Sequence, residues 1–471
     1  MTSSKVATAG IWYTIGNILI KGLSFLTLPL FTRLMSLSDY GLYTTYIAYE
    51  SILVVIISLG LYSSLKSANL QYPNKIDNFV STVSLLPIVS TILLVLISLV
   101  LSPVLIPIFG FGLSFILLMI IQALGSTILT MYNCRISLDY SYKSYLLISF
   151  LSSFGNIVLS LFFILFVCKD NAFAGRVYGT FLPTIILGII ILLHFFKKAK
   201  PVLSKDYIKF GLDYSLPLVP HGLSQLILAQ FGKIIIQNRI GNTEAGIYGF
   251  AYTIALIPQI IVQSLALAWG PWFFEQYSQN NYESIKKRST QYVGAFSLII
   301  IGLILVSPEI VKVMADRSYW ISIKIIGYAL LGVYFTFLYG LPVEIEYYYK
   351  KTNYLAIGTI IAAVFNVVLC LVVVPTKGYE YAVYITVLTY VLYFILHMII
   401  AKKLTGNSLP FELQKIIAYI GLVSGVCIIN NFIIDMWYAR YILAVNICIF
   451  IFVKNKDFIM PLINKRINGI K

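Results

Sequence analysis

The chain has 471 residues, of which 59% are hydrophobic and only 11% are charged. Soluble domains carry about 25% charged residues, so this composition excludes an ordinary soluble protein and indicates an integral membrane protein. The formal net charge of +16 raises the possibility of a nucleic-acid partner, which the placement of the cations argues against.

Apolar runs of about 20 residues recur along the chain, which is the length that an α-helix needs to cross a bilayer. Backbone polar groups in lipid must be paired within helices or a closed barrel, so runs of this length predict an all-α integral membrane protein with about 14 transmembrane helices. The predicted spans are residues 7–30, 43–62, 79–101, 104–132, 146–167, 174–196, 213–236, 246–270, 290–311, 320–346, 354–374, 379–400, 413–434 and 437–453.

Lysine and arginine indicate the orientation of these spans. An even number of spans puts both termini on one side, and 23 of the 34 cations fall in segments on that side, against 8 in the opposite loops. Because positively charged loops stay in the cytoplasm, both termini are predicted to be cytoplasmic. Most of the excess cations then face the anionic inner leaflet, so no nucleic-acid partner is expected.

An internal repeat relates "TRLMSLSDYGLYTTYIAY" at residues 32–49 to "NRIGNTEAGIYGFAYTI" at 238–254. The matched pairs are Arg33 with Arg239, Asp39 with Glu244, Gly41 with Gly246 and Tyr43 with Tyr248. Six spans separate the copies, so the halves should share orientation, as in parallel-repeat transporters. A bundle duplicated for structural reasons alone is the alternative.

The repeat predicts four parts of the chain. They are an N-terminal six-helix lobe (1–196), a basic cytoplasmic linker (197–212), a C-terminal six-helix lobe (213–400), and helices 13 and 14 with a basic cytoplasmic tail (401–471).

Polar residues follow one face of the first predicted span. Thr14, Asn17, Lys21 and Ser24 fall on a single stripe at helical spacing. A lysine at the centre of a span costs about 2.5–3.5 kcal/mol, so Lys21 is expected to face water, a carboxylate or an anionic substrate. Glu50, deep in the second span, is a possible ion-pair partner for Lys21, which is the structural alternative.

The stretch "DYSLPLVPHGLSQLILAQFGK", residues 213–233, carries two prolines in an apolar span. Such breaks persist only against protein or a water-filled cavity. His221 and Gln225 share one stripe and Lys233 lies on another, so a kinked helix is predicted to turn both inward. The alternatives are snorkelling for Lys233 and an interhelical hydrogen bond for His221.

Sequence motifs for catalysis are missing. The chain has no GxxxxGK[ST], HExxH or GxSxG motif, and its five cysteines show no metal-ligand spacing. The loops on the predicted outer side are too short for a glycosyltransferase site. The sequence therefore predicts a transporter without catalytic residues, a bound metal or a cofactor.

Four segments resemble the polysaccharide-export flippases, the O-antigen repeat-unit translocases of the multidrug/oligosaccharidyl-lipid/polysaccharide exporter superfamily. They are "KGLSFLTLPLFTRLMSLSDYGLY", "DYSLPLVPHGLSQ", "GNTEAGIYGFAYTI" and "LAWGPWFFE", and the similarity extends over nearly the whole chain. The resemblance implies movement of undecaprenyl-pyrophosphate-linked oligosaccharide to the outer leaflet of a bacterial inner membrane. It further implies alternating access between two lobes, ion-gradient coupling, and a polysaccharide polymerase and chain-length proteins as partners.

A pyrophosphate crossing hydrocarbon needs countercharge, which cavity cations would provide. The expected substrate-binding residues are Lys21, Asn17, Lys233, His221, Gln225, Arg33 and Arg239, and Glu50 is the expected coupling residue. Three alternatives stay open: a flippase for peptidoglycan precursors, a drug or cation antiporter with acidic and aromatic cavity residues, and a non-transporting scaffold of a polymerase complex.

Overall fold

The computed structural model describes residues 12–16, 19–20, 22–23 and 25–454, and every regular element in these ranges is helical. Eleven helices in this part of the chain are long and apolar enough to cross a membrane. The protein is an all-helical membrane protein, as its composition predicts. The first predicted span, 7–30, is described only in part, and each later span coincides with a helix or a pair of consecutive helices.

The chain divides into two compact units. The first comprises Met1–Phe250, Met314–Tyr319 and Lys351–Tyr393. Its helices are α2 (Leu28–Leu34), α3 (Leu37–Ser58), α4 (Leu65–Gln71), α5 (Ile76–Val83), α6 (Leu85–Val100), α7 (Ser102–Phe109), α8 (Leu113–Leu138), α9 (Tyr142–Phe162), α10 (Ala172–Lys198), α11 (Lys205–Ser215), α12 (Val219–Arg239), most of α13 (Asn242–Ala255), α18 (Thr352–Lys377) and the start of α19 (Glu380–Leu404). Short helical turns η1 (Leu61–Ser64), η2 (Phe163–Val167) and η3 (Leu216–Leu218) connect some of them.

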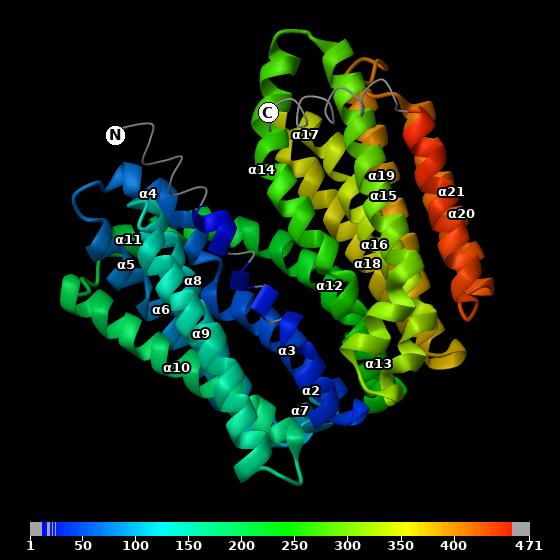
Figure 1. Ribbon diagram of the computed structural model, residues 1–471. Helices are drawn as coiled ribbons and strands as arrows, with labels where there is room; N and C mark the ends of the chain where they lie inside the picture. Colours follow the sequence, from blue (N-terminus) through cyan, green and yellow to red (C-terminus); the bar gives the residue numbers. More distant parts are fainter. Residues whose placement is uncertain (1–11, 17–18, 21, 24, 455–471) are drawn as a thin grey trace, which may run out of the picture. The chain divides into compact units, whose positions relative to one another are not determined.

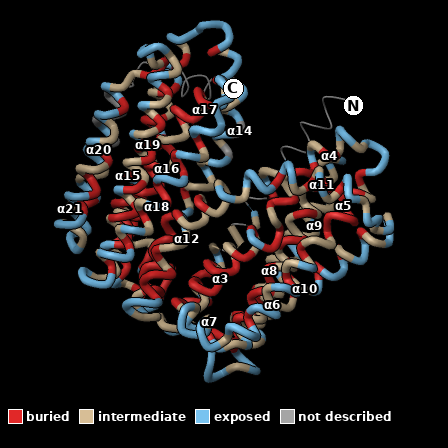
Figure 2. Tube along the Cα trace, turned by 180° about the vertical axis from the view of Figure 1, so that it is seen from behind, coloured by how far each residue is buried: buried red, intermediate tan, exposed pale blue. Residues whose placement is uncertain are grey.

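Helix α3 is central to the first unit, and it packs against α6, α8, α10 and α12. Figure 2 shows buried residues concentrated along it. Its core neighbours include Phe111, Met119 and Val177. Tyr46, fully buried in α3, donates a hydrogen bond to Gln122 Oε1 of α8 at 3.2 Å, which satisfies its hydroxyl away from water.

Small residues bring α8, α9 and α10 side by side (Figure 1). A Cβ on Gly188 of α10 would lie 2.9 Å from the Cα of Gly125 in α8, and one on Gly179 would lie 2.2 Å from the Cα of Ser160 in α9. Close backbone approach at small residues is typical of helix packing in lipid, where no hydrophobic drive holds helices together.

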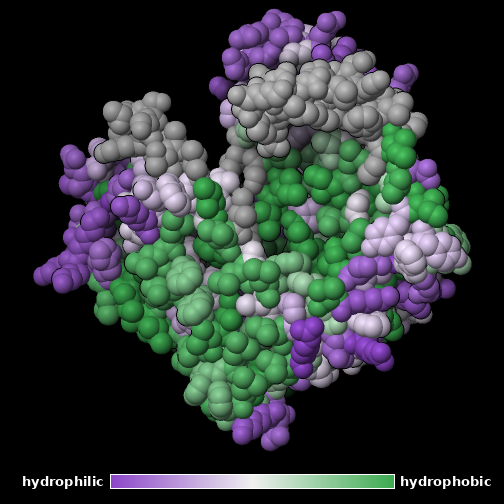
Figure 3. Space-filling model, in the orientation of Figure 1, coloured by the Kyte–Doolittle hydropathy of each residue, from purple (hydrophilic) through white to green (hydrophobic). Residues whose placement is uncertain are grey.

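The outward faces of these helices are strongly apolar. Only 11% of the span Tyr142–Val167 is buried within the protein, and Phe150, Phe154 and Leu193 are exposed. Figure 3 shows hydrophobic residues covering the broad side of this unit, with hydrophilic residues near its ends. A continuous apolar surface of this extent fits acyl chains as the solvent.

Two glycines from the repeat bring α3 and α13 into backbone contact. A Cβ on Gly41 would lie 1.9 Å from the carbonyl oxygen of Asn242, and one on Gly246 would lie 2.0 Å from that of Leu37. Asn242 precedes Gly246 by four residues, and Leu37 precedes Gly41 by four residues. The two contacts are therefore the same contact with the roles of α3 and α13 exchanged.

Hydrogen bonds show the same exchange. Thr32 donates from Oγ1 to the carbonyl of Met314 at 2.9 Å, and Asn238 donates from Nδ2 to the carbonyl of Ile108 at 2.8 Å. The two donors are 206 residues apart, as are the two acceptors. A two-fold relation between like-oriented copies produces exchanged contacts of this kind, so these pairs support the predicted parallel repeat.

The second unit comprises Ala251–Val313, Trp320–Lys350 and Phe394–Lys471. Its helices are the end of α13, α14 (Ile257–Ser278), α15 (Tyr282–Met314), α16 (Ile323–Leu338), α17 (Gly340–Tyr348), the end of α19, α20 (Leu413–Phe432) and α21 (Trp437–Lys454), with the second half of the turn η4 (Arg317–Ser322). Buried polar pairs hold this unit together. Glu346 and His397 lie 2.5 Å apart between Oε1 and Nδ1, and Arg440 of α21 donates to Glu309 Oε2 of α15 at 2.7 Å.

Several predicted spans are divided in the structure, among them 104–132 and 246–270. Residues 104–132 are split between α7 and α8, because Gly110 adopts a left-handed backbone conformation (φ +70°) that ends α7. Residues 246–270 are split between α13 and α14, and Pro258 occupies the first turn of α14, where its missing N–H costs no hydrogen bond. The predicted lobe boundaries stay a prediction, because the compact units follow packing rather than the repeat.

Candidate functional site

The α-helix over 213–233 is interrupted early, at the two predicted prolines. Helix α11 ends at Ser215, the 3₁₀ turn η3 (Leu216–Leu218) contains Pro217, and α12 begins at Val219 with Pro220 in its first turn, where a proline needs no backbone donor. The interruption precedes His221, and α12 is continuous from His221 to Lys233. His221 and Lys233 are 12 residues apart, about 120° around a straight helix, so the two predicted stripes lie on different faces of α12.

His221 and Gln225 are both half-buried near the start of α12. The Nδ1 atom of His221 is buried and has no hydrogen-bond partner among the described residues. Ser224, between them, donates from Oγ to the carbonyl of Pro220 at 2.8 Å and so belongs to the helix itself. Helix α12 packs against α3 and α18. His221 and Gln225 therefore lie in the first unit, as do Lys233 and Glu50.

Lys233 is a half-buried cation with a neutral partner. Its Nζ donates to Oε1 of Gln230 at 2.9 Å, and no carboxylate pairs with it in the described part of the chain. Gln230 lies about one turn toward the start of α12, so the ammonium is bound by a residue of its own helix. Snorkelling stays the alternative role for Lys233.

Glu50 is buried in α3, and its carboxylate Oε1 accepts a hydrogen bond from Ser126 Oγ of α8 at 2.6 Å. No described cation pairs with it. Lys21, its predicted partner, lies outside the described residues, as does Asn17, so the Lys21–Glu50 pair and the stripe on the first span stay predictions. A buried carboxyl group held by a single hydroxyl is costly when charged, which marks Glu50 as a group that can exchange a proton.

Arg33 and Arg239 occupy equivalent positions in the repeat. Each is exposed and lies in the last turn of its helix, α2 or α12. A cation at a helix C-terminus is stabilised by the partial negative charge there, by roughly 0.3–1 kcal/mol. Both positions fit the predicted place at the ends of spans, and this helix-end role is sufficient to explain either arginine.

Arg176 of α10 is a cation whose role the sequence did not reveal. Its guanidinium lies 3.6 Å from the ring centroid of Phe31 and 4.9 Å from that of Tyr43. Its NH1 atom is buried and has no acceptor in the described ranges. Cation–π contacts of this kind hold a guanidinium without neutralising it. The rings come from α2 and α3, far away in sequence, so only the tertiary structure identifies this group.

Three ionisable groups of the first unit thus lie within its helices without a described partner of opposite charge: Lys233 in α12, Arg176 in α10 and Glu50 in α3. Such groups are expensive in a membrane-spanning segment and usually mark a pathway for substrate or ions. The described residues contain no cluster of His, Cys, Asp and Glu that could hold a metal ion.

Comparisons with known proteins agree with this picture. Residues 6–277 match the model of a family described as "Polysaccharide biosynthesis protein". A protein of Haemophilus influenzae, "Lsg locus putative protein 1", is 22% identical over an alignment of 387 residues that covers 77% of this chain and 90% of that protein.

Solved structures show the fold. The lipid II flippase MurJ in an inward closed conformation superimposes with a TM-score of 0.73 and 15% identity, covering 95% of this chain and all of MurJ. An inward-facing multidrug resistance transporter of the MATE family and MOP superfamily superimposes with a TM-score of 0.64 and 14% identity, covering 85% of this chain and all of that one. The fold is similar to that of MurJ and of the MATE transporter, and the chain belongs to the polysaccharide biosynthesis protein family.

Proposed function

We propose that this protein is a flippase for undecaprenyl-pyrophosphate-linked oligosaccharide repeat units. It moves them from the cytoplasmic to the outer leaflet of the bacterial inner membrane for assembly of an O-antigen-like surface polysaccharide. Membership of a polysaccharide biosynthesis family, together with a fold similar to that of a lipid flippase, supports this proposal. The observation that carries the proposal is Lys233, a cation within α12 whose described partner is only a neutral amide.

The chemistry of Lys233 suits an anionic cargo. A pyrophosphate in a low-dielectric passage needs charge-assisted hydrogen bonds. Because the Lys233 ammonium is bound to the amide of Gln230 rather than to a carboxylate, phosphate oxygen can replace the amide without breaking an ion pair. Arg176 offers a second cation, a guanidinium that also lacks a described carboxylate partner. Lys21 and Asn17 are proposed to line the same path, with His221 and Gln225, and Arg33 and Arg239 to lie at its outer end.

The test is export of polysaccharide in a strain that lacks this gene. Wild-type protein is expected to restore surface polymer, Lys233→Ala to abolish most of it, and Lys233→Arg to retain part because the charge remains. Lys169→Ala is the matched control, since Lys169 is exposed in the loop before α10. Membrane abundance is measured for every variant.

Normal polymer in the Lys233→Ala strain at normal abundance would remove Lys233 from the mechanism. Failure of the wild-type gene to restore polymer would reject the flippase itself. The same comparison with Lys21→Ala tests the first span.

A peptidoglycan-precursor flippase is the second candidate, because the superposition on MurJ extends over 95% of this chain. Both cargoes are lipid pyrophosphates, so the two candidates share the countercharge argument. They differ in the cell: loss of a sole peptidoglycan-precursor flippase stops growth, whereas loss of a repeat-unit flippase removes surface polymer. A non-transporting scaffold would leave purified vesicles without flipping activity.

The wider mechanism is proposed on the same basis. Two six-helix lobes, 1–196 and 213–400, would alternate access around the path, with both termini in the cytoplasm and an ion gradient acting through Glu50. A polysaccharide polymerase and chain-length proteins are the proposed partners on the outer side.

A further inference from the structure

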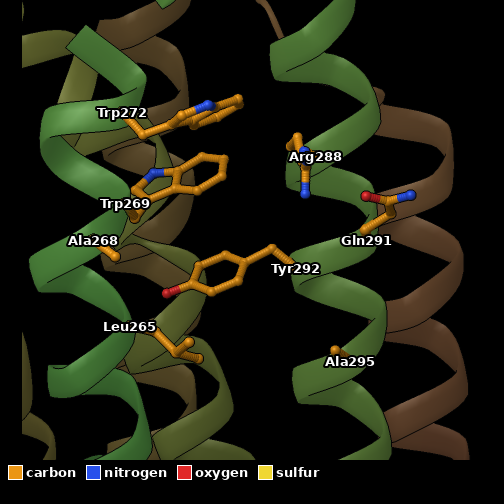
Figure 4. A pocket seen from close by; sticks show the side chains of 8 residues that line it. All are labelled: Leu265, Ala268, Trp269, Trp272, Arg288, Gln291, Tyr292 and Ala295. Carbon is orange, nitrogen blue, oxygen red and sulfur yellow. The ribbon is translucent and has the colours of Figure 1, made fainter. Parts of the chain in front are cut away.

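A cavity of about 480 Å³ lies between α14 and α15 in the second unit. Its volume falls within the range of small-molecule sites, roughly 300–1,000 Å³. Three aromatic side chains, Trp269, Trp272 and Tyr292, line it together with Arg288 and Gln291 (Figure 4).

The aromatic side chains form a continuous surface. The rings of Trp269 and Tyr292 are parallel within 5° at a centroid distance of 5.0 Å, and Trp272 lies 5.1 Å from Trp269. Phe337 supports Tyr292 edge-on at 4.9 Å. Figure 4 shows both indoles reaching from α14 toward α15, while Tyr292 crosses toward α14 below them. The negative face of an aromatic ring attracts the C–H bonds on the apolar face of a sugar.

Polar groups gather at the same end of the cavity. Arg288 lies on the wall opposite the indoles, with Gln291 nearby on α15 (Figure 4). The indole Nε1 of Trp269 is buried and has no hydrogen-bond partner among the described residues. A guanidinium binds phosphate bidentately, and an amide both donates to and accepts from hydroxyl groups. This end therefore offers one anion site and several sites for hydroxyls.

The other end of the cavity is apolar. Leu265 and Ala295 line it below Tyr292 (Figure 4), and α15 is one of the helices apolar enough to cross a membrane. A ligand that fills both ends must be amphiphilic, with a charged and hydroxylated head joined to a hydrocarbon chain.

We infer that this cavity binds the headgroup of the lipid-linked oligosaccharide, with the first sugar against the two indoles and its phosphate on Arg288. The inference rests on the proposed function and adds a headgroup site to it, built from residues other than Lys233. An organic cation is the competing occupant, because the carboxylate of Glu344 lies 3.3 Å from where a Cβ on Gly270 would be. A cation would depend on Glu344, whereas a sugar phosphate depends on Arg288.

The test measures binding to the purified full-length protein by quenching of tryptophan fluorescence. The probe is farnesyl pyrophosphate that carries one N-acetylglucosamine. Farnesyl pyrophosphate alone, N-acetylglucosamine 1-phosphate and ethidium are run in parallel, so that lipid, free sugar phosphate and organic cation are distinguished. The glycolipid is expected to bind more tightly than either of its halves.

Arg288→Gln is expected to weaken glycolipid binding by about tenfold, as loss of one charge-assisted hydrogen bond implies. Arg288→Lys should retain part of the affinity as a point charge. Lys287→Gln is the matched control, because Lys287 is the exposed neighbouring cation outside the cavity lining, and its affinity should equal that of the wild type. Melting temperature and gel filtration establish that each variant is folded.

Equal affinities in Arg288→Gln and Lys287→Gln would overturn the headgroup site. So would ethidium binding that depends on Glu344 together with glycolipid binding that is no tighter than that of farnesyl pyrophosphate alone. Neither result rejects the flippase, which is tested separately by restoration of surface polymer and by flipping in vesicles.

Discussion

At Glu50 a carboxyl group buried in α3 has a serine hydroxyl as its described partner, at 2.6 Å. A charged carboxylate in such a place is stabilised by a nearby cation, and a neutral one needs only hydrogen bonds. Binding and release of a proton at Glu50 would therefore change the attraction for any cation or phosphate that shares its surroundings. This is the physical basis for proposing Glu50 as the coupling residue.

Glu50→Gln keeps the size of the side chain and an oxygen that accepts the hydrogen bond from Ser126. We expect the variant to accumulate and fold like the wild type, while losing the stimulation of flipping by a proton gradient. Reconstituted vesicles with and without an imposed pH gradient measure this difference. A variant that is stimulated as strongly as the wild type would exclude Glu50 as the coupling residue.

Individual site residues were only partly predictable from the sequence. The positions of Lys233, His221 and Glu50 in apolar spans predict that these polar side chains lie away from bulk water. The hydrogen bond from Lys233 to Gln230 was not predicted, because several side-chain geometries are compatible with the same spacing. Arg176 and the aromatic residues around Arg288 were not identified as site residues, since their partners come from different helices.

At the scale of helices, the crossing of α3 and α13 depends on two glycines. Gly41→Ala would place a methyl group 1.9 Å from the carbonyl oxygen of Asn242, and Gly246→Ala would meet Leu37 in the same way. Both atoms are backbone, so the helices must separate. We expect either variant to destabilise the protein by about 3 kcal/mol or more, seen as a lower melting temperature in detergent.

Gly302→Ala is the control for these glycines, because nothing lies within 4 Å of its added Cβ. A helix-interior alanine in open space is expected to be neutral or to stabilise by up to about 1 kcal/mol. If Gly41→Ala melts at the same temperature as Gly302→Ala, the close crossing does not exist in the folded protein.

The last helix, α21, is attached to α15 through Arg440. This side chain is 2% exposed and pairs with Glu309, while its NH1 also donates to the carbonyl of Leu305 at 2.5 Å. Removing one partner of a buried pair costs about 3–5 kcal/mol. We expect Arg440→Ala to destabilise the protein by an amount near the lower end of this range, because Glu309 is partly exposed. We also expect limited proteolysis of this variant to cut the chain near α21 first.

Lys415→Ala is the comparison for Arg440. Lys415 pairs with Glu412 at an exposed site, where ion pairs contribute about 0–1 kcal/mol. Equal melting temperatures for the two variants would contradict an anchoring role for Arg440.

Most helices were predictable, because a run of apolar residues long enough to cross lipid must pair its backbone groups internally and therefore forms a helix. The breaks at Gly110 and Pro258 were not predicted. The left-handed conformation of Gly110 and the helix start at Pro258 depend on local packing as well as on residue type. The break at Pro217 and Pro220 was predicted, but sequence alone did not show that α12 is continuous from His221 to Lys233.

For the whole molecule, the distribution of lysine and arginine predicts the orientation. Reporter fusions in the loops before α10 and after α18 are expected to show active alkaline phosphatase, and fusions after α19 to show fluorescent green fluorescent protein. This follows because positively charged loops stay in the cytoplasm. The opposite pattern at all three places would reverse the topology and the proposed direction of transport.

The central claim is that the protein carries a lipid pyrophosphate across the membrane with Lys233 as countercharge. The most direct measurement reconstitutes it into vesicles that contain an undecaprenyl-pyrophosphate-linked sugar in both leaflets and follows access of a membrane-impermeant lectin to the inner pool. We predict rapid exposure of the inner pool by the wild type, slow exposure by Lys233→Ala and an intermediate rate for Lys233→Arg. An inner pool that stays hidden with the wild type, or that Lys233→Ala exposes at the wild-type rate, would contradict the claim.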